Sequence, residues 1–256
     1  MFDKNIIASD SFECIPLDWD TNYFEVNSAR VNLKGEIDNS AKDTITDFCK
    51  DYEFITISNE GNYNKNNNWI GTKMNAFLAD INIKFTKTAN LNIIDAEKNM
   101  SKCNMSINNF YPRNDEILDI AKDAFQFSRF FNDCNLPFMK TSNIYLHWTE
   151  CAFDKPDKYF AVSEINGKVA GYLLFSIHEK QLTSVMELMA VGRSYKGIGI
   201  GDTLIKSMDS FIYEKGITQI LVGTQLDNII AARLFLSQGF KYKGCSSIYH
   251  LWNNKK

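Results

Sequence analysis

The sequence predicts an α/β protein made of two units, a smaller one at residues 1–110 and a larger one at residues 111–256. Short runs in which apolar and polar residues alternate, such as residues 81–85, indicate half-buried strands. Longer segments with apolar residues at every third or fourth position indicate amphipathic helices that cover these strands. A chain of 256 residues is long enough for two units of this kind.

The elements of the smaller unit follow from these two patterns. Strands are expected at residues 28–34, 54–58 and 81–85, and a helix is expected at residues 40–50. The asparagine-rich segment 62–68 is short and polar, so it is expected to be a loop. Residues 99–115 are polar and irregular and include Pro112, which makes them the predicted linker to the larger unit.

The larger unit opens with two expected helices, one that starts at Asp115 and carries Arg129, and one at residues 143–151. Two β-rich runs follow, at residues 159–165 and 168–177. The Asn166-Gly167 pair between them readily adopts the positive φ angles of a type I′ turn and predicts a hairpin. The remaining elements are expected in the order strand 184–191, helix 202–215, strand 217–222, helix 228–238 and strand 242–252.

The overall composition is that of an ordinary globular protein, with 45% hydrophobic and 23% charged residues. This excludes a disordered chain, a collagen-like repeat and a bundle of membrane helices. The net charge of −3 offers no general attraction to nucleic acid or anionic lipid. The N-terminus has no signal-peptide pattern, and no window is apolar enough to span a membrane. We therefore expect a cytoplasmic protein.

The cysteines and histidines do not predict a metal site. The six cysteines form no C-x-x-C pair, and the three histidines lie far apart in the sequence. A structural zinc site needs closely spaced pairs of such ligands. We expect reduced thiols and no bound metal.

The most informative segment is a glycine-rich turn between a buried strand and a helix. It reads Lys196-Gly197-Ile198-Gly199-Ile200-Gly201. Glycine lets backbone N–H groups approach a ligand closely, and the start of a helix adds unpaired N–H donors and a partial positive charge. Such a turn is suited to bind a phosphate or a pyrophosphate.

Three phosphate-binding designs use glycines in this way. A P-loop needs a lysine after its last glycine, where this chain has Asp202-Thr203. A dinucleotide fingerprint needs the spacing G-x-G-x-x-G, whereas the spacing here is G-x-G-x-G. The pyrophosphate loop of acetyltransferases, Q/R-x-x-G-x-G/A, is matched with Lys196 in the first place. Taken alone, the hexapeptide also fits an ordinary turn from a strand to a helix.

Together with its flanks, the segment resembles the GNAT superfamily of acyl-CoA-dependent N-acyltransferases over residues 115–256. The preceding Glu187-Leu188-Met189-Ala190-Val191 looks like the splayed fourth strand of that family. The run from Asn228 to Phe235, closed by Gly239-Phe240, resembles its second signature, a helix that begins with asparagine. The resemblance implies a GNAT fold with a mixed central sheet and flanking helices, and acetyl-CoA as the acyl donor.

Shorter motifs are similar to one group of this superfamily, the dTDP-fucosamine (dTDP-4-amino-4,6-dideoxygalactose) acetyltransferases. They lie at residues 16–24, at residues 127–130 with Trp148, and at residues 247–252. This resemblance implies that the smaller unit is a reduced GNAT-like unit. It also implies transfer of an acetyl group to the amine of a nucleotide-linked amino sugar in cell-surface polysaccharide synthesis. The oligomeric state is not fixed by the sequence, which leaves a homodimer open.

The resemblance also assigns roles to individual residues on the cofactor side. The pantetheine arm would contact backbone groups of the splayed strand, the pyrophosphate would lie in the glycine turn, and the second helix would contact the cofactor. The residues so assigned are Met189, Ala190, Val191, Lys196, Gly197, Ile198, Gly199, Ile200, Gly201, Asn228 and Phe235.

On the chemical side, the resemblance implies that Glu187 accepts the proton of the attacking amine, directly or through water. The family places a tyrosine as the acid on the second helix, but this chain has Phe235 there, which cannot donate a proton. Tyr249 is the expected substitute, and Arg129 and His250 are expected to contact the acceptor substrate.

Two alternative functions stay open at this point. A GNAT acetyltransferase could act on protein N-termini or on another small amine, because the larger unit alone does not identify the acceptor. The other alternative is a non-catalytic module that binds acyl-CoA. It is considered because Phe235 stands where the family has its acid.

Overall fold

The computed structural model describes residues 6–91 and 103–253, which form two compact units. Unit 1 contains the chain up to Ile83 together with Ser128–Thr141 and the residues from Gly244 onward. Unit 2 contains Lys84–Phe127 and Ser142–Lys243. This division does not coincide with the boundary expected after residue 110. The reason is that two long strands, β5 (Phe77–Thr88) and β11 (Lys241–Trp252), each have residues in both units.

The sheet of unit 1 is mixed. Its strand order is β1-β2-β3-β4-β11-β5, where β1 is Ile7–Ala8, β2 is Phe12–Pro16, β3 is Ser28–Leu33 and β4 is Phe54–Glu60. Strands β3 and β4 run parallel, whereas β2 pairs with β3, and β11 with β4, in antiparallel fashion. Four consecutive residues of β4, Phe54 to Ile57, are buried, and successive side chains point to opposite faces, so both faces of the sheet are covered at this strand.

Each face of the unit 1 sheet has its own helices. Helices α2 (Asn39–Cys49) and α3 (Asn64–Thr72) supply Ile45 and Ile70 to a core that includes Val31 and Ile57 of the sheet. The other face is covered by α1 (Asp18–Phe24) and by the segment 128–141, which ends in the short helix α5 (Phe138–Thr141). There Phe24 packs against Phe54 and Phe130.

The sheet of unit 2 has the strand order β5-β10-β9-β8-β7-β6. Its strands are β6 (Cys103–Asn109), β7 (Lys158–Ile165), β8 (Lys168–His178), β9 (Thr183–Val191) and β10 (Gln219–Gln225). Strands β6 to β9 are antiparallel neighbours, and β10 then pairs parallel to β9. This is the mixed central sheet that was expected.

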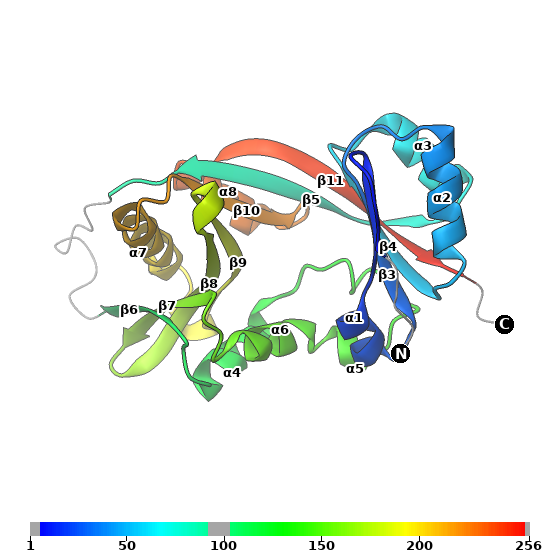
Figure 1. Ribbon diagram of the computed structural model, residues 1–256. Helices are drawn as coiled ribbons and strands as arrows, with labels where there is room; N and C mark the ends of the chain where they lie inside the picture. Colours follow the sequence, from blue (N-terminus) through cyan, green and yellow to red (C-terminus); the bar gives the residue numbers. More distant parts are fainter. Residues whose placement is uncertain (1–5, 92–102, 254–256) are drawn as a thin grey trace. The chain divides into compact units, whose positions relative to one another are not determined.

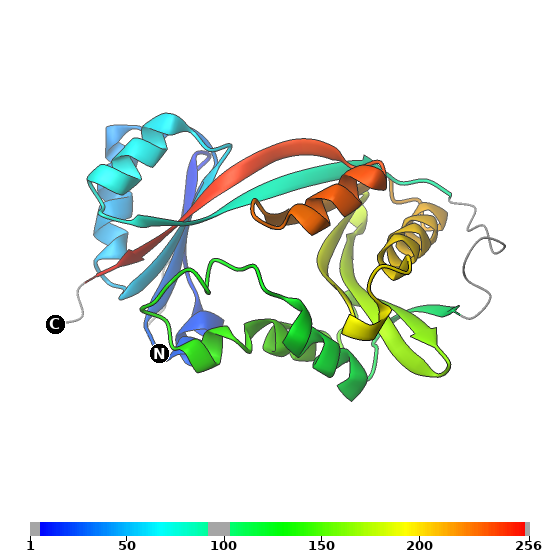
Figure 2. The same cartoon turned by 180° about the vertical axis from the view of Figure 1, so that it is seen from behind.

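Helices flank both faces of this sheet (Figures 1 and 2). Helices α4 (Asp115–Ala124) and α6 (Ile144–Ala152) cover one face, over a core that contains Ile117, Phe160 and Tyr172. Helix α7 (Ile200–Glu214) covers the other face, where Phe211 contacts Tyr159 and Phe175. Helix α8 (Ile229–Ser237) follows β10.

Most expected elements of unit 2 are confirmed, including the hairpin at Asn166-Gly167, where both residues have positive φ. Three expectations were wrong. Residues 103–109 of the expected linker form strand β6, which pairs with β7, while residues 99–102 lie outside the described part. The helix that starts at Asp115 ends at Ala124, because the backbone of Phe125 is extended, so Arg129 is not helical.

The third wrong expectation concerns the asparagine-rich segment, which forms most of helix α3 instead of a loop. Two of its asparagines make specific tertiary hydrogen bonds. The Asn66 side chain donates to the backbone carbonyl of Gly35, at 2.8 Å, and to Asn59 Oδ1. The Asn67 Oδ1 atom accepts from Asn59, at 2.6 Å. Asparagine is a weak helix former, so the local sequence alone favours a loop. These tertiary contacts offset that low helix propensity.

Among the residues that the structure describes, no helix combines the length and the apolar character that crossing a membrane requires. The six cysteines have free thiols in the structure.

Gly171 on β8 allows the end of β9 and the start of α7 to approach closely. A Cβ atom at this position would lie 2.9 Å from the carbonyl oxygen of Ala190 and 3.0 Å from Ile200 Cγ2. We expect Gly171→Ala to lower the free energy of unfolding by roughly 1–3 kcal/mol, because the strand and the helix must move apart. Urea denaturation measures this. Gly71→Ala is the matched control, since no atom lies within 4 Å of its Cβ position, and equal effects of both changes would contradict the expectation.

Candidate active site

The glycine turn of unit 2 leads directly into helix α7. After β9 ends at Val191, a short 3₁₀ turn and Lys196 lead to Gly197 and Gly199, whose φ angles are +79° and +90°. Gly199 is the N-cap residue of α7, and the first helical residue, Ile200, is buried. The segment from Lys196 to Gly199 is exposed, so the turn presents its backbone to solvent at the positive end of the helix dipole.

Gly201 has a different role from the other two glycines. The helix starts at Ile200 and not near residue 202, so Gly201 lies in its first turn. A Cβ atom there would lie 3.2 Å from Leu234 Cδ2 of α8. This glycine therefore permits close packing of α7 on α8.

A gap opens between the two parallel strands beside this turn. Strands β9 and β10 pair only from Thr183 with Gln219 to Met186 with Val222, although both strands continue further. Opposite β8, the register shifts so that Glu187 is an extra residue on β9. A bulge of this kind bends the strand and ends its pairing. Beyond Met186, β9 therefore separates from β10.

A cavity of about 110 Å³ lies where the strands separate. It is lined by both strands, by α8 on one side, and by two aromatic residues that precede the strands in the sequence. The lining residues are Phe125, Tyr145, Met186, Glu187, Leu188, Met189, Val222, Gly223, Thr224, Gln225, Asn228, Ala231 and Phe235. All of them belong to unit 2.

Comparison with known proteins identifies this architecture. Residues 115–240 match the model of the acetyltransferase (GNAT) family. A GCN5-related N-acetyltransferase from Sphaerobacter thermophilus shares the fold, with a TM-score of 0.63 over 94% of this chain and 76% of that one, at 13% identity. Residues 115–240 form a GNAT acetyltransferase domain. The predicted GNAT fold is confirmed.

The GNAT family consists of acetyltransferases, and acetyl-CoA is the acyl donor of the family. Two curated relatives are similar in sequence. One is the spore coat polysaccharide biosynthesis protein SpsD from Bacillus subtilis (strain 168), 29% identical over 55% of this chain. The other is the N-acetylaspartate synthetase of Homo sapiens, 28% identical over 38% of this chain. The matched segments span 48% and 32% of these relatives, respectively.

Several residues expected on the cofactor side line the cavity or the turn. Met189, Asn228 and Phe235 line the cavity, and Lys196 lies exposed in the turn. Asn228 also caps α8, because its side-chain oxygen accepts a hydrogen bond from the backbone N–H of Ala231 at 3.2 Å.

The side chains of Ala190 and Val191 do not line the cavity. Ala190 packs in the core of the GNAT domain, and Val191 pairs with Gly171 on β8. A role for these two residues toward the cofactor is therefore limited to their backbone.

Glu187 lines the cavity at the bulge and makes an ion pair with Lys158, with 2.6 Å between the Lys158 Nζ and Glu187 Oε1 atoms. Both side chains keep about a quarter of their surface exposed. The pair fixes the carboxylate at the point where the strands diverge.

Among the lining residues that were not selected from the sequence are two aromatic residues, Phe125 and Tyr145. Their rings stack with 4.4 Å between centroids, and the Tyr145 hydroxyl donates to the backbone carbonyl of Phe127 at 3.1 Å. Tyr145 belongs to a helix that was expected, but an aromatic residue on a buried helix face is usually a core residue. No local pattern separates the two roles.

Tyr249, His250 and Arg129 lie in unit 1, not among the residues that line the cavity. Tyr249 is buried in the apolar core beneath α2, and this burial raises the pKa of its hydroxyl. Arg129 places its guanidinium 4.0 Å from the ring centroid of Phe130. It also acts on the buried Asp20, whose pKa is raised because burial outweighs the attraction of Arg129 and Arg30.

His250 is fully buried and belongs to a hydrogen-bonded cluster. Its Nδ1 lies 2.7 Å from Asp133 Oδ2, which also accepts from Trp252 Nε1 at 2.9 Å. Burial lowers the pKa of His250, although Asp133 acts in the opposite direction. Burial tends to raise the pKa of Asp133, but hydrogen bonds from His250, Trp252 and Asn135 outweigh it and lower that pKa. The cluster ties the segment 128–141 to β11.

These shifts predict that acid destabilises unit 1. A histidine whose pKa is lower in the folded state takes up its proton in the unfolded state first, so stability falls as the pH drops below about 6.5. Because the pKa of Asp133 is lowered in the folded state, the free energy of unfolding falls further below about pH 4.

The urea concentration at the midpoint of unfolding, measured at pH 7, 6 and 5, reports the loss of stability that comes from His250. We expect His250→Gln to reduce the pH dependence in this range and His147→Gln, at a partly exposed site in unit 2, to retain it. The same pH dependence in His250→Gln as in the native protein would contradict the assignment.

Proposed function

We propose that this protein transfers the acetyl group of acetyl-CoA to the amine of a nucleotide-linked amino sugar in the synthesis of a cell-surface polysaccharide. The observation that carries the transferase part is the cavity between β9 and β10, which lies between Glu187 and the start of α8. The polysaccharide part is supported by the similarity to SpsD, a spore coat polysaccharide biosynthesis protein.

The proposed reaction needs a place for a thioester and a proton acceptor. The amine nitrogen attacks the thioester carbonyl, a C–N bond forms, and the C–S bond breaks to release the CoA thiolate. Glu187 accepts the proton that the amine loses, directly or through water. The ion pair with Lys158 holds the carboxylate in position for this step.

The thiolate must gain a proton, and two residues are candidates for supplying it. The expected donor, Tyr249, lies in the core of unit 1. Tyr145 is the one phenol among the described residues that line the cavity of the GNAT domain. We favour Tyr145, because a proton donor must come within hydrogen-bonding reach of the reacting atom, directly or through one water.

The acceptor is tested by thiol release from acetyl-CoA with a panel of dTDP- and UDP-linked amino sugars. Parallel reactions contain a peptide with a free N-terminus, or aspartate, which is included because of the similarity to N-acetylaspartate synthetases. Release with a nucleotide sugar supports the proposal. Release only with the peptide or with aspartate would replace the proposed acceptor. Tight binding of acetyl-CoA without turnover of any amine would indicate a non-catalytic module.

The glycine turn gives a test of cofactor binding. We expect Gly199→Glu to abolish binding of acetyl-CoA in calorimetry, because it adds a negative charge where the pyrophosphate would lie. Gly199→Ala is the matched control, since it imposes the same backbone strain at a φ of +90° without the charge. Equal affinity of both variants in folded protein would contradict the location of the pyrophosphate.

A second test addresses the proton donor. We expect Tyr145→Phe to lower kcat by about 10²-fold with little change in the KM for acetyl-CoA, and to remove the alkaline limb of the pH–rate profile. Tyr249→Phe should leave kcat unchanged. Phe235→Tyr in the Tyr145→Phe background should restore part of the activity, since it places a phenol elsewhere on the cavity wall.

The opposite pattern, a loss of kcat in Tyr249→Phe alone, would return the role to Tyr249. Unchanged kcat in both single variants would make water the proton source.

A further inference from the structure

A second cavity of the GNAT domain is basic and polar, and the proposed reaction does not use it. It has a volume of about 540 Å³. The residues that line it come from the end of β5, the middle of α7, the end of α8 and the start of β11, and they are Lys87, Thr88, Asn90, Lys206, Ser237, Gln238, Gly239 and Lys241. We call this cavity the lysine pocket. Its volume falls in the range of small-molecule sites.

The charges of the lysine pocket are only partly balanced. Lys87 is buried and pairs with the fully buried Asp209, with 2.6 Å between Lys87 Nζ and Asp209 Oδ2. The other oxygen of Asp209 accepts a hydrogen bond from the backbone N–H of Asn90 at 2.8 Å. No carboxylate is among the described residues that line the pocket. Lys206 and Lys241 therefore give it a charge of about +2, which matches a phosphomonoester at neutral pH.

The lysine pocket is connected to the glycine turn by one hydrogen bond. The Gln238 side-chain nitrogen, which lines the pocket, donates to Asp202 Oδ1 at 2.6 Å. Asp202 is the third residue of α7, directly after the turn. The contact brings the pocket next to the start of α7, where the pyrophosphate is expected.

We propose that the lysine pocket binds the 3′-phosphate of coenzyme A, with Lys206 and Lys241 as its cationic contacts. The proposal rests on the proposed function, since it assumes that the cofactor pyrophosphate lies in the glycine turn. Coenzyme A carries a phosphomonoester on the ribose that adjoins its pyrophosphate. A pocket with two lysines beside the turn fits this group in both charge and location. The polar lining does not suit an apolar ligand.

The test compares coenzyme A with dephospho-coenzyme A, which lacks only the 3′-phosphate. Calorimetry on the native protein should show that coenzyme A binds about tenfold or more tightly, and that the ratio falls as salt is raised. The double variant Lys206→Ala/Lys241→Ala should bring the ratio of the two affinities close to one, with the affinity for dephospho-coenzyme A unchanged. Lys87 is kept, because its removal would leave the charge of the buried Asp209 without its partner and would destabilise the fold.

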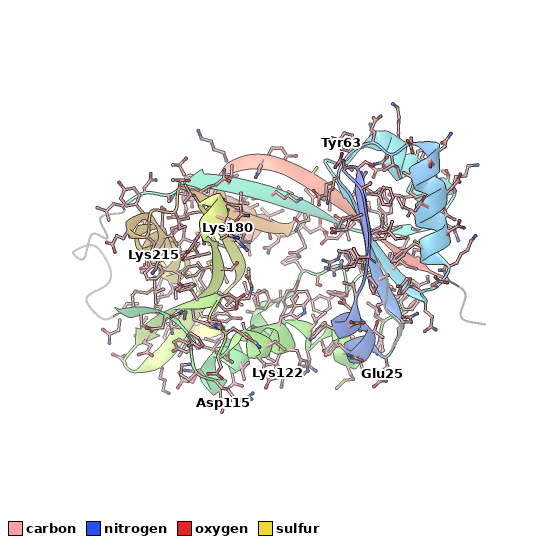
Figure 3. The ribbon with its side chains drawn as sticks, in the orientation of Figure 1. Glu25, Tyr63, Asp115, Lys122, Lys180 and Lys215 are labelled. Carbon is pink, nitrogen blue, oxygen red and sulfur yellow. The ribbon has the colours of Figure 1, made fainter. Side chains whose placement is uncertain are left out.

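The matched control is Lys122→Ala, on the exposed side of α4 and therefore over the other face of the sheet from α7 (Figure 3). It removes one surface positive charge, where the double variant removes two, and the native affinity ratio should persist. A double variant that retains the native ratio would overturn the assignment, and so would equal affinity of the native protein for the two compounds.

Two further outcomes separate the possible failures. If the native protein binds neither compound, the proposed function is wrong and the assignment of the pocket falls with it. If the double variant loses affinity for coenzyme A and for dephospho-coenzyme A by the same factor, the two lysines do not contact the 3′-phosphate and the proposal is overturned.

Discussion

The divergence of β9 from β10 is the constraint on which the site depends. Two adjacent parallel strands normally satisfy each other's backbone groups along their whole length, and unpaired N–H and C=O groups away from water are costly. Here the pairing stops at Met186, and the extra residue Glu187 on β9 accounts for the bend. Beyond Met186, β9 no longer pairs with β10, and the proposed function assigns this backbone to the amide groups of a pantetheine arm.

The glycine turn depends on the same geometry. Helix α7 must start close to the end of β9 if its N-terminus is to adjoin the cavity, and two glycines allow this. Because Gly171 has no side chain, the backbone of β9 and the side chain of Ile200 can pack against it. Gly201 likewise leaves room for Leu234 of α8. Gly199 then takes the left-handed conformation that begins the helix. Glycines at these positions therefore serve packing as well as ligand access, which the sequence spacing alone does not distinguish.

Residues expected on the cofactor side lie around the cavity and the turn, whereas those expected to contact the acceptor lie in unit 1, and the difference has a physical reason. The turn, the diverging strand and α8 lie within residues 183–239, so their spacing along the chain reflects their spacing in the fold. Phe125 and Tyr145 reach the cavity from segments far from β9 in sequence, and only tertiary packing places them there. The same limit explains the wrong interpretation of residues 62–68, where Asn59 and Gly35 supply the partners that make a helix of asparagines stable.

Arg129 and His250 show why residue type alone is a weak guide. Arg129 was expected to contact substrate because an arginine can bind a phosphate or carboxylate, and His250 because it is a titratable group on the last strand. In the structure, His250 is held in a buried cluster with Asp133 and Trp252, and the Arg129 guanidinium lies over Phe130. A histidine that donates to a buried carboxylate stabilises the fold whether or not a ligand is present.

Phe235 illustrates how a catalytic group can be exchanged for packing. Its ring is buried and lies between Phe85 of β5 and Phe240, so it joins α8 to the neighbouring strand. A hydroxyl at this position would need a hydrogen-bond partner in a largely apolar environment. The leaving group makes the exchange tolerable. A thiol has a pKa of roughly 8.5, far below that of an alcohol, so a thiolate leaves without full proton transfer. Catalysis then needs only a weakly acidic donor, and such a donor can come from a different helix of the domain.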